Sequence, residues 1–251
     1  MAGYIGTKAV SLNVTSGDIL GDVSVGGDIT GAGNLSVDGG TIKLDGNYPV
    51  GTDNVALGDT ALDSLTSGTL STAIGSGALT ANTTGHSNTA LGQHAVKTAT
   101  TATYNTGLGR LALGAATTGS FNTAVGALSG DAITTGADNT FVGYQSGSGT
   151  TTGADNTAIG QDALLANTTG ASNVAVGSLA LDSNTTASYN TAVGYQAASS
   201  NTTGGLNSSF GRGALYSNTT GASNVALGYE TLYYNTTASN NTAVGYQAGL
   251  S

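Results

Sequence analysis

The chain has 251 residues, of which 41 are glycine, one is proline and none is cysteine, and its formal net charge is −9. Five Lys and Arg against 14 Asp and Glu supply no basic stripe for a phosphate backbone, which excludes nucleic-acid binding. The absence of cysteine excludes disulfides and thiolate metal sites. With no Trp and three Phe, the composition favours a thin, layered core.

Two segments precede the regular part of the chain. Residues 1–20 lack the unbroken apolar run of a secretory signal, and no stretch of the sequence approaches the roughly 18 apolar residues of a membrane helix. We therefore expect assembly in a cytosol, without membrane insertion. In residues 21–53 short apolar pairs, such as Val23 with Val25, alternate with Gly and Asp. They predict a fibrous region of short strands interleaved between three chains, with a turn at Pro49.

From residue 54 to residue 251 one unit recurs every 17 residues. Its clearest copy, "NTAVGYQA", begins at Asn190 and again at Asn241. A glycine follows the first position by four residues in every copy: Gly58, Gly75, Gly92, Gly109, Gly126, Gly143, Gly160, Gly177, Gly194, Gly211, Gly228 and Gly245. We interpret this column as the point where a strand ends and a Cβ does not fit.

The repeat predicts one coil of a parallel β-solenoid. An apolar residue precedes each glycine and a small residue precedes that one, which is typical of a short strand with one face in a tight interior. A second apolar pair, such as Ala78-Leu79, predicts a second short strand. The closing "NTTG", as at Asn82 to Gly85, predicts a turn whose Asn and Gly adopt positive φ. Twelve coils make a rod on the order of 55 Å long.

The pattern N-T-A-V-G-x-x-A resembles the head repeat of trimeric autotransporter adhesins, which implies a β-roll packed as a trimer. The same sequence pattern, together with "NTTG", resembles the repeats of bacteriophage virion fibres, especially those of marine and cyanobacterial hosts. The opening "MAGYIGTKAV" is similar to that of several marine phage fibre proteins, which implies a virion-docking segment in residues 1–20. Without a signal peptide, a heptad stalk or membrane strands, the sequence fits a fibre better than an exported adhesin.

These observations predict a structural tail fibre located on the virion, a parallel homotrimer attached to another virion protein by its N-terminus and open to contact with a host surface glycan. A head decoration fibre is the alternative within the same class. An enzyme is not expected: His86 and His94 have no recurring partners, no Ser-His-Asp arrangement has supporting context, and no cofactor is implied.

Several columns admit a binding role beside a structural one. Asp138 and Asp155 occupy the same position in neighbouring coils and are candidates for a Ca²⁺ site or for plain solvation. A tyrosine follows the glycine at Tyr144, Tyr195, Tyr229 and Tyr246, and either stacks on sugar rings or packs between chains.

A threonine ladder is the basis of an alternative from another class, an ice-binding solenoid. Its members are Thr66, Thr83, Thr100, Thr117, Thr134, Thr151, Thr168, Thr185, Thr202, Thr219 and Thr236, each followed by Thr or, once, Ser. Adjacent residues of a strand point to opposite sides, so this pattern does not place two hydroxyls of a coil on one face. The Asn-X-Thr tripeptides match the glycosylation pattern but recur because the turn recurs.

Overall fold

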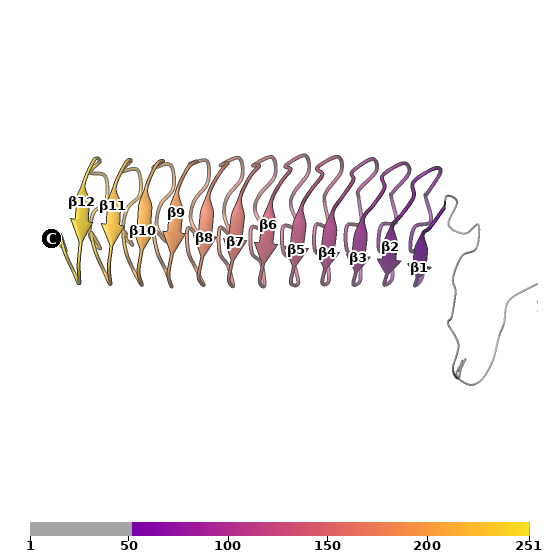
Figure 1. The fold of residues 1–251 in the computed structure, drawn as a ribbon, viewed down its shortest axis with the longest axis horizontal. Coiled ribbons are helices and arrows are strands. Elements are labelled where there is room, and N and C mark those ends of the chain that lie inside the picture. The colour runs from indigo at the N-terminus through magenta and orange to yellow at the C-terminus, as the bar shows by residue number, and fades with distance from the viewer. Residues whose placement is uncertain (1–51, 251) are drawn as a thin grey trace, which may run out of the picture. The chain divides into compact units, whose positions relative to one another are not determined.

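The computed structural model describes residues 52–250, and every regular element in that range is a short β-strand (Figure 1). The strands have three residues each and form one parallel, 12-stranded sheet in which each strand pairs with the next along the chain. In chain order they are β1 (Val55–Leu57), β2 (Thr72–Ile74), β3 (Thr89–Leu91), β4 (Thr106–Leu108), β5 (Thr123–Val125), β6 (Thr140–Val142), β7 (Thr157–Ile159), β8 (Val174–Val176), β9 (Thr191–Val193), β10 (Ser208–Phe210), β11 (Val225–Leu227) and β12 (Thr242–Val244). The described residues contain no helix, and the predicted all-β parallel β-solenoid of twelve coils is confirmed.

The register of the sheet keeps equivalent repeat positions in columns. Val55 pairs with Thr72, and Leu57 pairs with Ile74, so each residue meets its counterpart in the next coil. Figure 1 shows the coils as successive turns of similar outline along the rod. The attachment segment expected at residues 1–20 lies outside the described residues. The same holds for residues 21–51 of the fibrous region expected at residues 21–53.

The interior is thin and consists mainly of alanine. The middle residue of most strands is Ala, as at Ala73, Ala90 and Ala124, and these side chains are completely buried. The strand residues on either side lie on the outer face, because successive side chains of a strand alternate between its two faces. The larger buried side chains of ordinary coils are leucines from the other half of the coil, such as Leu113.

The predicted second strand is wrong. Ala78 and Leu79 are neighbours in sequence and both are completely buried, an arrangement that an extended strand does not allow. Leu79 has φ of 50°, in the left-handed region, and Leu113 and Leu164 repeat this with φ of 53° and 56°. This half of the coil is a run of turn residues in which left-handed positions direct consecutive apolar side chains inward.

One coil departs from the alanine core, and its neighbours compensate. Phe141, in the middle of β6, is completely buried. Gly130 and Gly147 stand where other coils have Leu113 or Leu164. A Cβ on Gly147 would lie 2.6 Å from the Phe141 ring, and one on Gly130 would lie 2.8 Å from it. The ring therefore occupies the space of two leucine side chains.

Buried asparagine side chains join the coils. The first asparagine column comprises the residue before each strand: Asn54, Ser71, Asn88, Asn105, Asn122, Asn139, Asn156, Asn173, Asn190, Asn207, Asn224 and Asn241. The Asn122 Oδ1 atom accepts the backbone N–H of Asn139 at 3.1 Å, and its Nδ2 atom donates to the Gly136 carbonyl at 2.9 Å. Buried backbone groups that the short strands leave unpaired are satisfied in this way.

A second asparagine column belongs to the "NTTG" segments, and its role differs from the prediction. Asn167 is completely buried, and its Nδ2 atom donates to the Gly170 carbonyl at 3.0 Å. Neither Asn167 nor Gly170 has positive φ. Gly170 is required instead by close approach, because a Cβ there would lie 2.2 Å from the Ala187 carbonyl oxygen of the next coil. The left-handed residue is Ser172, two positions later, with φ of 56°.

Candidate interaction surfaces

The glycine after each strand turns the chain between two exposed columns. These twelve glycines have φ between 127° and 138°, a region that L side chains rarely adopt. A Cβ on Gly160 would also lie 2.6 Å from the backbone carbon of Gly177. The same glycine therefore ends the strand and permits the close stacking of the coils.

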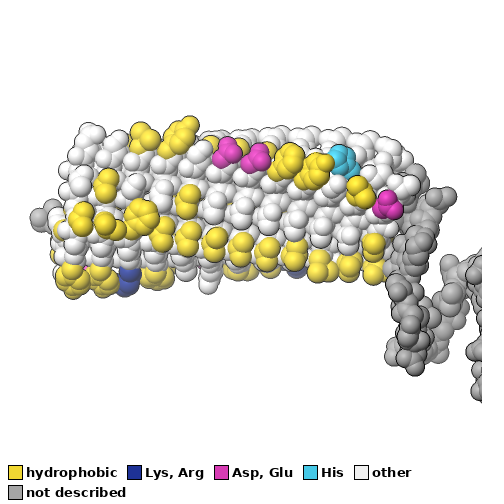
Figure 2. Space-filling view, in the orientation of Figure 1, with side chains coloured by type: hydrophobic (Ala, Val, Ile, Leu, Met, Phe, Trp, Pro, Cys, Tyr) yellow, Lys and Arg dark blue, Asp and Glu magenta, His cyan; other side chains and the backbone are white. Residues whose placement is uncertain are grey.

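The residue just before this glycine forms the apolar ridge. Its members are Leu57, Ile74, Leu91, Leu108, Val125, Val142, Ile159, Val176, Val193, Phe210, Leu227 and Val244. All twelve are apolar, and none is buried within the single chain; Leu91, for example, is 46% exposed. Figure 2 shows hydrophobic side chains in a row that runs along the rod. One face of the predicted strand thus lies in the interior, as expected, and the other is an uncovered apolar surface.

The residue just after this glycine forms the outer turn column. Its members are Asp59, Ser76, Gln93, Arg110, Ala127, Tyr144, Gln161, Ser178, Tyr195, Arg212, Tyr229 and Tyr246. All four tyrosines named from the sequence lie in it and are exposed. They share a column but do not form one continuous stack, because Gln161 and Ser178 separate Tyr144 from Tyr195.

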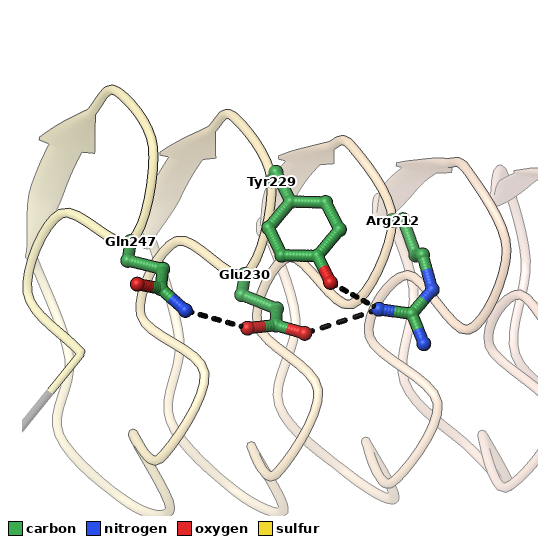
Figure 3. A network of polar contacts seen from close by, with 4 residues as sticks. All are labelled: Arg212, Tyr229, Glu230 and Gln247. Atoms are coloured by element: carbon green, nitrogen blue, oxygen red, sulfur yellow. Dashed lines mark hydrogen bonds and ion pairs between the residues drawn. The ribbon is translucent and has the colours of Figure 1, made fainter.

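The C-terminal part of this column is an ordered network across four coils, from Tyr195 to Tyr246. Figure 3 shows its polar contacts, which involve Arg212, Tyr229, Glu230 and Gln247. The Arg212 guanidinium lies over the ring of Tyr195, 5.8 Å from its centroid, and over that of Tyr229, at 5.3 Å. Tyr229 in turn stacks on Tyr246, with centroids 5.3 Å apart and ring planes 8° from parallel. The Tyr229 and Tyr246 rings are therefore parallel neighbours in successive coils.

Polar contacts fix these side chains. The Arg212 Nη1 atom donates to the Tyr229 hydroxyl at 2.7 Å and forms an ion pair with Glu230 at 3.0 Å. Gln247 donates from Nε2 to the other Glu230 oxygen at 2.9 Å. Hydrogen bonds from Gln247 and Tyr229 lower the pKa of the Glu230 carboxyl, and the bond to Glu230 raises the pKa of the Tyr229 hydroxyl. Sequence reasoning identified the tyrosines but missed Arg212, which lies in the same column, and Glu230, which follows Tyr229.

The carboxylates proposed for Ca²⁺ are exposed residues of neighbouring coils. Asp138 and Asp155 have φ of 57° and 59°, and they precede the first asparagine column. The residues described by the structure contain no group of three or more His, Asp or Glu arranged to hold a metal ion. The pair therefore gains no further ligand of this kind within residues 52–250.

The two threonines of each coil differ in exposure. The first threonine column is half-buried in most coils, and its hydroxyls donate to the carbonyl of the next member, as from Thr83 to Thr100 at 3.0 Å. The second column, which includes Thr84 and Thr101, is exposed in every coil. The second column therefore presents its hydroxyl groups to solvent, whereas the hydroxyls of the first column bond between coils.

The two histidines occupy different positions of the coil. The His86 ring contacts Tyr104 edge to face, with centroids 5.1 Å apart, and its Nδ1 atom lies 3.3 Å from the Ser87 hydroxyl. His94 occupies the position after the outer turn column and has left-handed φ of 57°. The asparagine of most Asn-Thr-Thr tripeptides is buried in the folded coil, as at Asn82, whereas Asn235 is half-buried and Asn240, in Asn-Asn-Thr, is exposed.

Comparison with protein-family models, curated proteins and solved structures gave no match. Within residues 52–250 there is also no helix of the length and apolarity that a membrane crossing needs. The surfaces of the coil are accordingly the observations from which a function is inferred.

Proposed function

We propose that this chain is a structural fibre protein of a virion, a tail fibre in which three parallel copies pack along the apolar ridge. The observation that carries the proposal is the ridge itself. It presents one apolar side chain from every coil, over the full length of the described rod.

The energetics of the ridge favour association. Together its side chains offer on the order of several hundred Å² of apolar surface, the size above which patches on soluble proteins mark interaction sites. Covering that surface is favourable by about 25 cal/mol per Å². The buried interior, by contrast, holds mostly alanine, which contributes little per coil. Association therefore adds a second apolar layer that the single chain lacks.

The constant repeat length explains why copies pack in parallel and in register. Each ridge residue is separated from the next by one coil, so identical chains present identical spacings to one another. The number three rests on the resemblance of the repeat to trimeric adhesin heads. A closed three-fold arrangement covers the same ridge on every copy, as symmetric assemblies do.

The virion location rests on the resemblance of the repeat and of residues 1–10 to phage fibre proteins. A repetitive rod suits such a role, because the work of a fibre is mechanical and multivalent. A head decoration fibre is the alternative on the same particle. Electron microscopy of particles labelled with an antibody to this chain separates a tail location from a head location.

The native mass of the full chain tests the assembly. Sedimentation equilibrium is expected to give three times the chain mass of 24.2 kDa. Leu91→Asp with Ile159→Asp places two carboxylates on the ridge and is expected to yield monomers that keep their β-structure. Thr118→Asp adds a charge at an exposed position outside the ridge and serves as the control. A monomeric wild type would refute the proposal.

Attachment is tested separately. Removal of residues 1–20 is expected to leave the native mass unchanged and to abolish co-sedimentation with fibre-less particles. Retained binding of the shortened chain would place the docking site elsewhere.

Ice binding has less support. The first threonine column donates its hydroxyls to the next coil, so the two neighbouring threonines of a coil do not present a paired array to solvent. Measurement of thermal hysteresis would detect this activity directly, and we expect none.

A further inference from the structure

In the outer turn column, Tyr195 has a large neighbour, Arg212, on one side and a small neighbour, Ser178, on the other. Arg212 covers the face of Tyr195 that is directed toward the C-terminal coils. On the other side the next member of the column is Ser178, followed by Gln161. Tyr229 differs, because Tyr246 stacks on its ring and Arg212 bonds to its hydroxyl.

The space over Ser178 has the dimensions of a sugar ring. Tyr195 and Gln161 are two coils apart, which corresponds to about 10 Å along the rod. A pyranose ring in van der Waals contact with Tyr195 fills the nearer half of that distance. Its hydroxyl groups then lie within reach of the Gln161 amide on the far side and of the Ser178 hydroxyl below.

We propose that this place, formed by Tyr195, Ser178 and Gln161, binds a neutral hexose at a branch or at the end of a polysaccharide. The axial C–H groups of a pyranose form an apolar face that packs on an aromatic ring, and its hydroxyls require both donors and acceptors. Tyr195 supplies the ring face, and the serine hydroxyl donates and accepts. The Gln161 Nε2 atom donates to Asp162 Oδ2 at 3.1 Å, which leaves the amide oxygen of Gln161 as an acceptor.

Charge selects a neutral sugar over an acidic one. The chain has a formal net charge of −9, which repels uronic or sulfated polysaccharides. Arg212 is the nearest cation in the column, and its ion pair with Glu230 offsets its charge. The contact of Arg212 with Tyr195 instead occupies one face of the ring, which leaves the other face for a ligand.

A single sugar bound on an open surface binds weakly, and one site on each of three copies raises the overall affinity. This multivalency, but not the site itself, rests on the proposed trimeric fibre.

Affinity electrophoresis of the full chain in native gels tests the site. The gels contain galactomannan, whose branches are single neutral hexoses, or dextran, with alginate as the acidic polysaccharide. We expect the wild type to be retarded by galactomannan or dextran and not by alginate. Tyr195→Ala removes the ring face, and Ser178→Tyr fills the space beside it; each is expected to weaken binding about fivefold to tenfold. Tyr246→Ala removes an exposed tyrosine outside the site and should bind as the wild type does.

Native mass measured on the same variants separates this proposal from the fibre proposal. Loss of retardation in Tyr195→Ala with an unchanged mass supports a sugar site. A changed mass would mean that Tyr195 packs between chains and would overturn the sugar site. No retardation of the wild type by either neutral polysaccharide, or undiminished retardation of Ser178→Tyr, would also overturn it. Retardation of a monomeric wild type would leave the sugar site standing while refuting the trimer.

Discussion

Asn122 donates its backbone N–H to the side-chain oxygen of Asn105, one coil earlier, at 2.9 Å. Its own side chain repeats this contact toward the next coil. Asn122→Leu would leave the Asn139 N–H and the Gly136 carbonyl buried without these partners, at about 1 to 3 kcal/mol for each group. We therefore expect a clear fall in the urea midpoint of unfolding.

Asn122→Ser is the matched control for that variant. The chain itself has Ser71 in this column, and the Ser71 hydroxyl accepts the Asn88 N–H at 3.2 Å. The serine variant should therefore lose less stability than the leucine variant. Equal losses would show that the amide contacts do not carry the stability of the column.

Gly160→Ala tests the glycine column at its centre. The added Cβ meets the Gly177 backbone at 2.6 Å, and φ of 138° is itself unfavourable for alanine. A loss of several kcal/mol is expected from clash and strain together. Gly205→Ala is the control, because its Cβ would lie 3.0 Å from only one atom, the Ser188 oxygen, and other coils have Ala171 or Ala222 at that position. Thermal unfolding of both variants gives the comparison, and equal melting temperatures would contradict this role of the column.

We expect substitutions at Phe141 and Gly147 to have coupled effects on the free energy of unfolding. Phe141→Ala should cost about 3 to 5 kcal/mol, because it empties a fully buried site. Gly147→Leu should also destabilise, since the new side chain overlaps the Phe141 ring. The double variant recreates the pairing of Ala158 with Leu164 and should recover much of the loss, apart from the space beside Gly130. A double-mutant cycle from urea unfolding measures the coupling, and simple additivity would exclude it.

Asp182 predicts a pH dependence of stability. Burial raises the pKa of its carboxyl above the ordinary 3.8, and the hydrogen bond from Ser199 opposes the shift. Folding therefore disfavours the ionised form, so the wild type should gain stability as pH falls from neutral through the raised pKa toward 3.8. Asp182→Asn should lack this contribution. The difference between their urea midpoints should move in favour of the wild type on acidification, and a constant difference would contradict the assignment.

Removal of one complete coil should be tolerated. Deletion of Asn156 to Ser172 joins β6 to β8 and lets the Asn173 N–H bond to Asn139 as it now bonds to Asn156. The rod should shorten by about 4.8 Å and keep its cooperative unfolding. A deletion that ends one residue earlier, at Ala171, moves every residue after it by one position relative to the columns of the preceding coils. This variant should not fold. Circular dichroism and protease resistance distinguish the two, and equal behaviour would argue against column stacking.

The repeat length, the strand and the glycine column could be predicted from the sequence, because each depends on a residue type that recurs in every copy. It did not reveal the second half of the coil. The neighbours Ala78 and Leu79 look like part of a strand, and only the left-handed conformation of Leu79 explains why both are buried. Nor does a sequence distinguish a glycine needed for positive φ, such as Gly160, from one needed for close approach, such as Gly170. The Arg212 network could not be predicted from the repeat pattern, because it is confined to a few coils and the pattern consists of features common to all coils.

The bonds between coils run along the rod, from each residue to its counterpart 17 positions later, as between Thr66 and Thr83. Under tension along that axis the coils are loaded in series, so the force at which the rod yields is that of its weakest interface and does not grow with length. A coil that detaches adds roughly 55 to 60 Å of extended chain in place of about 5 Å of rod. The rod would thus dissipate a pull in steps, one coil at a time, and each coil could restack on its neighbour once the load is released.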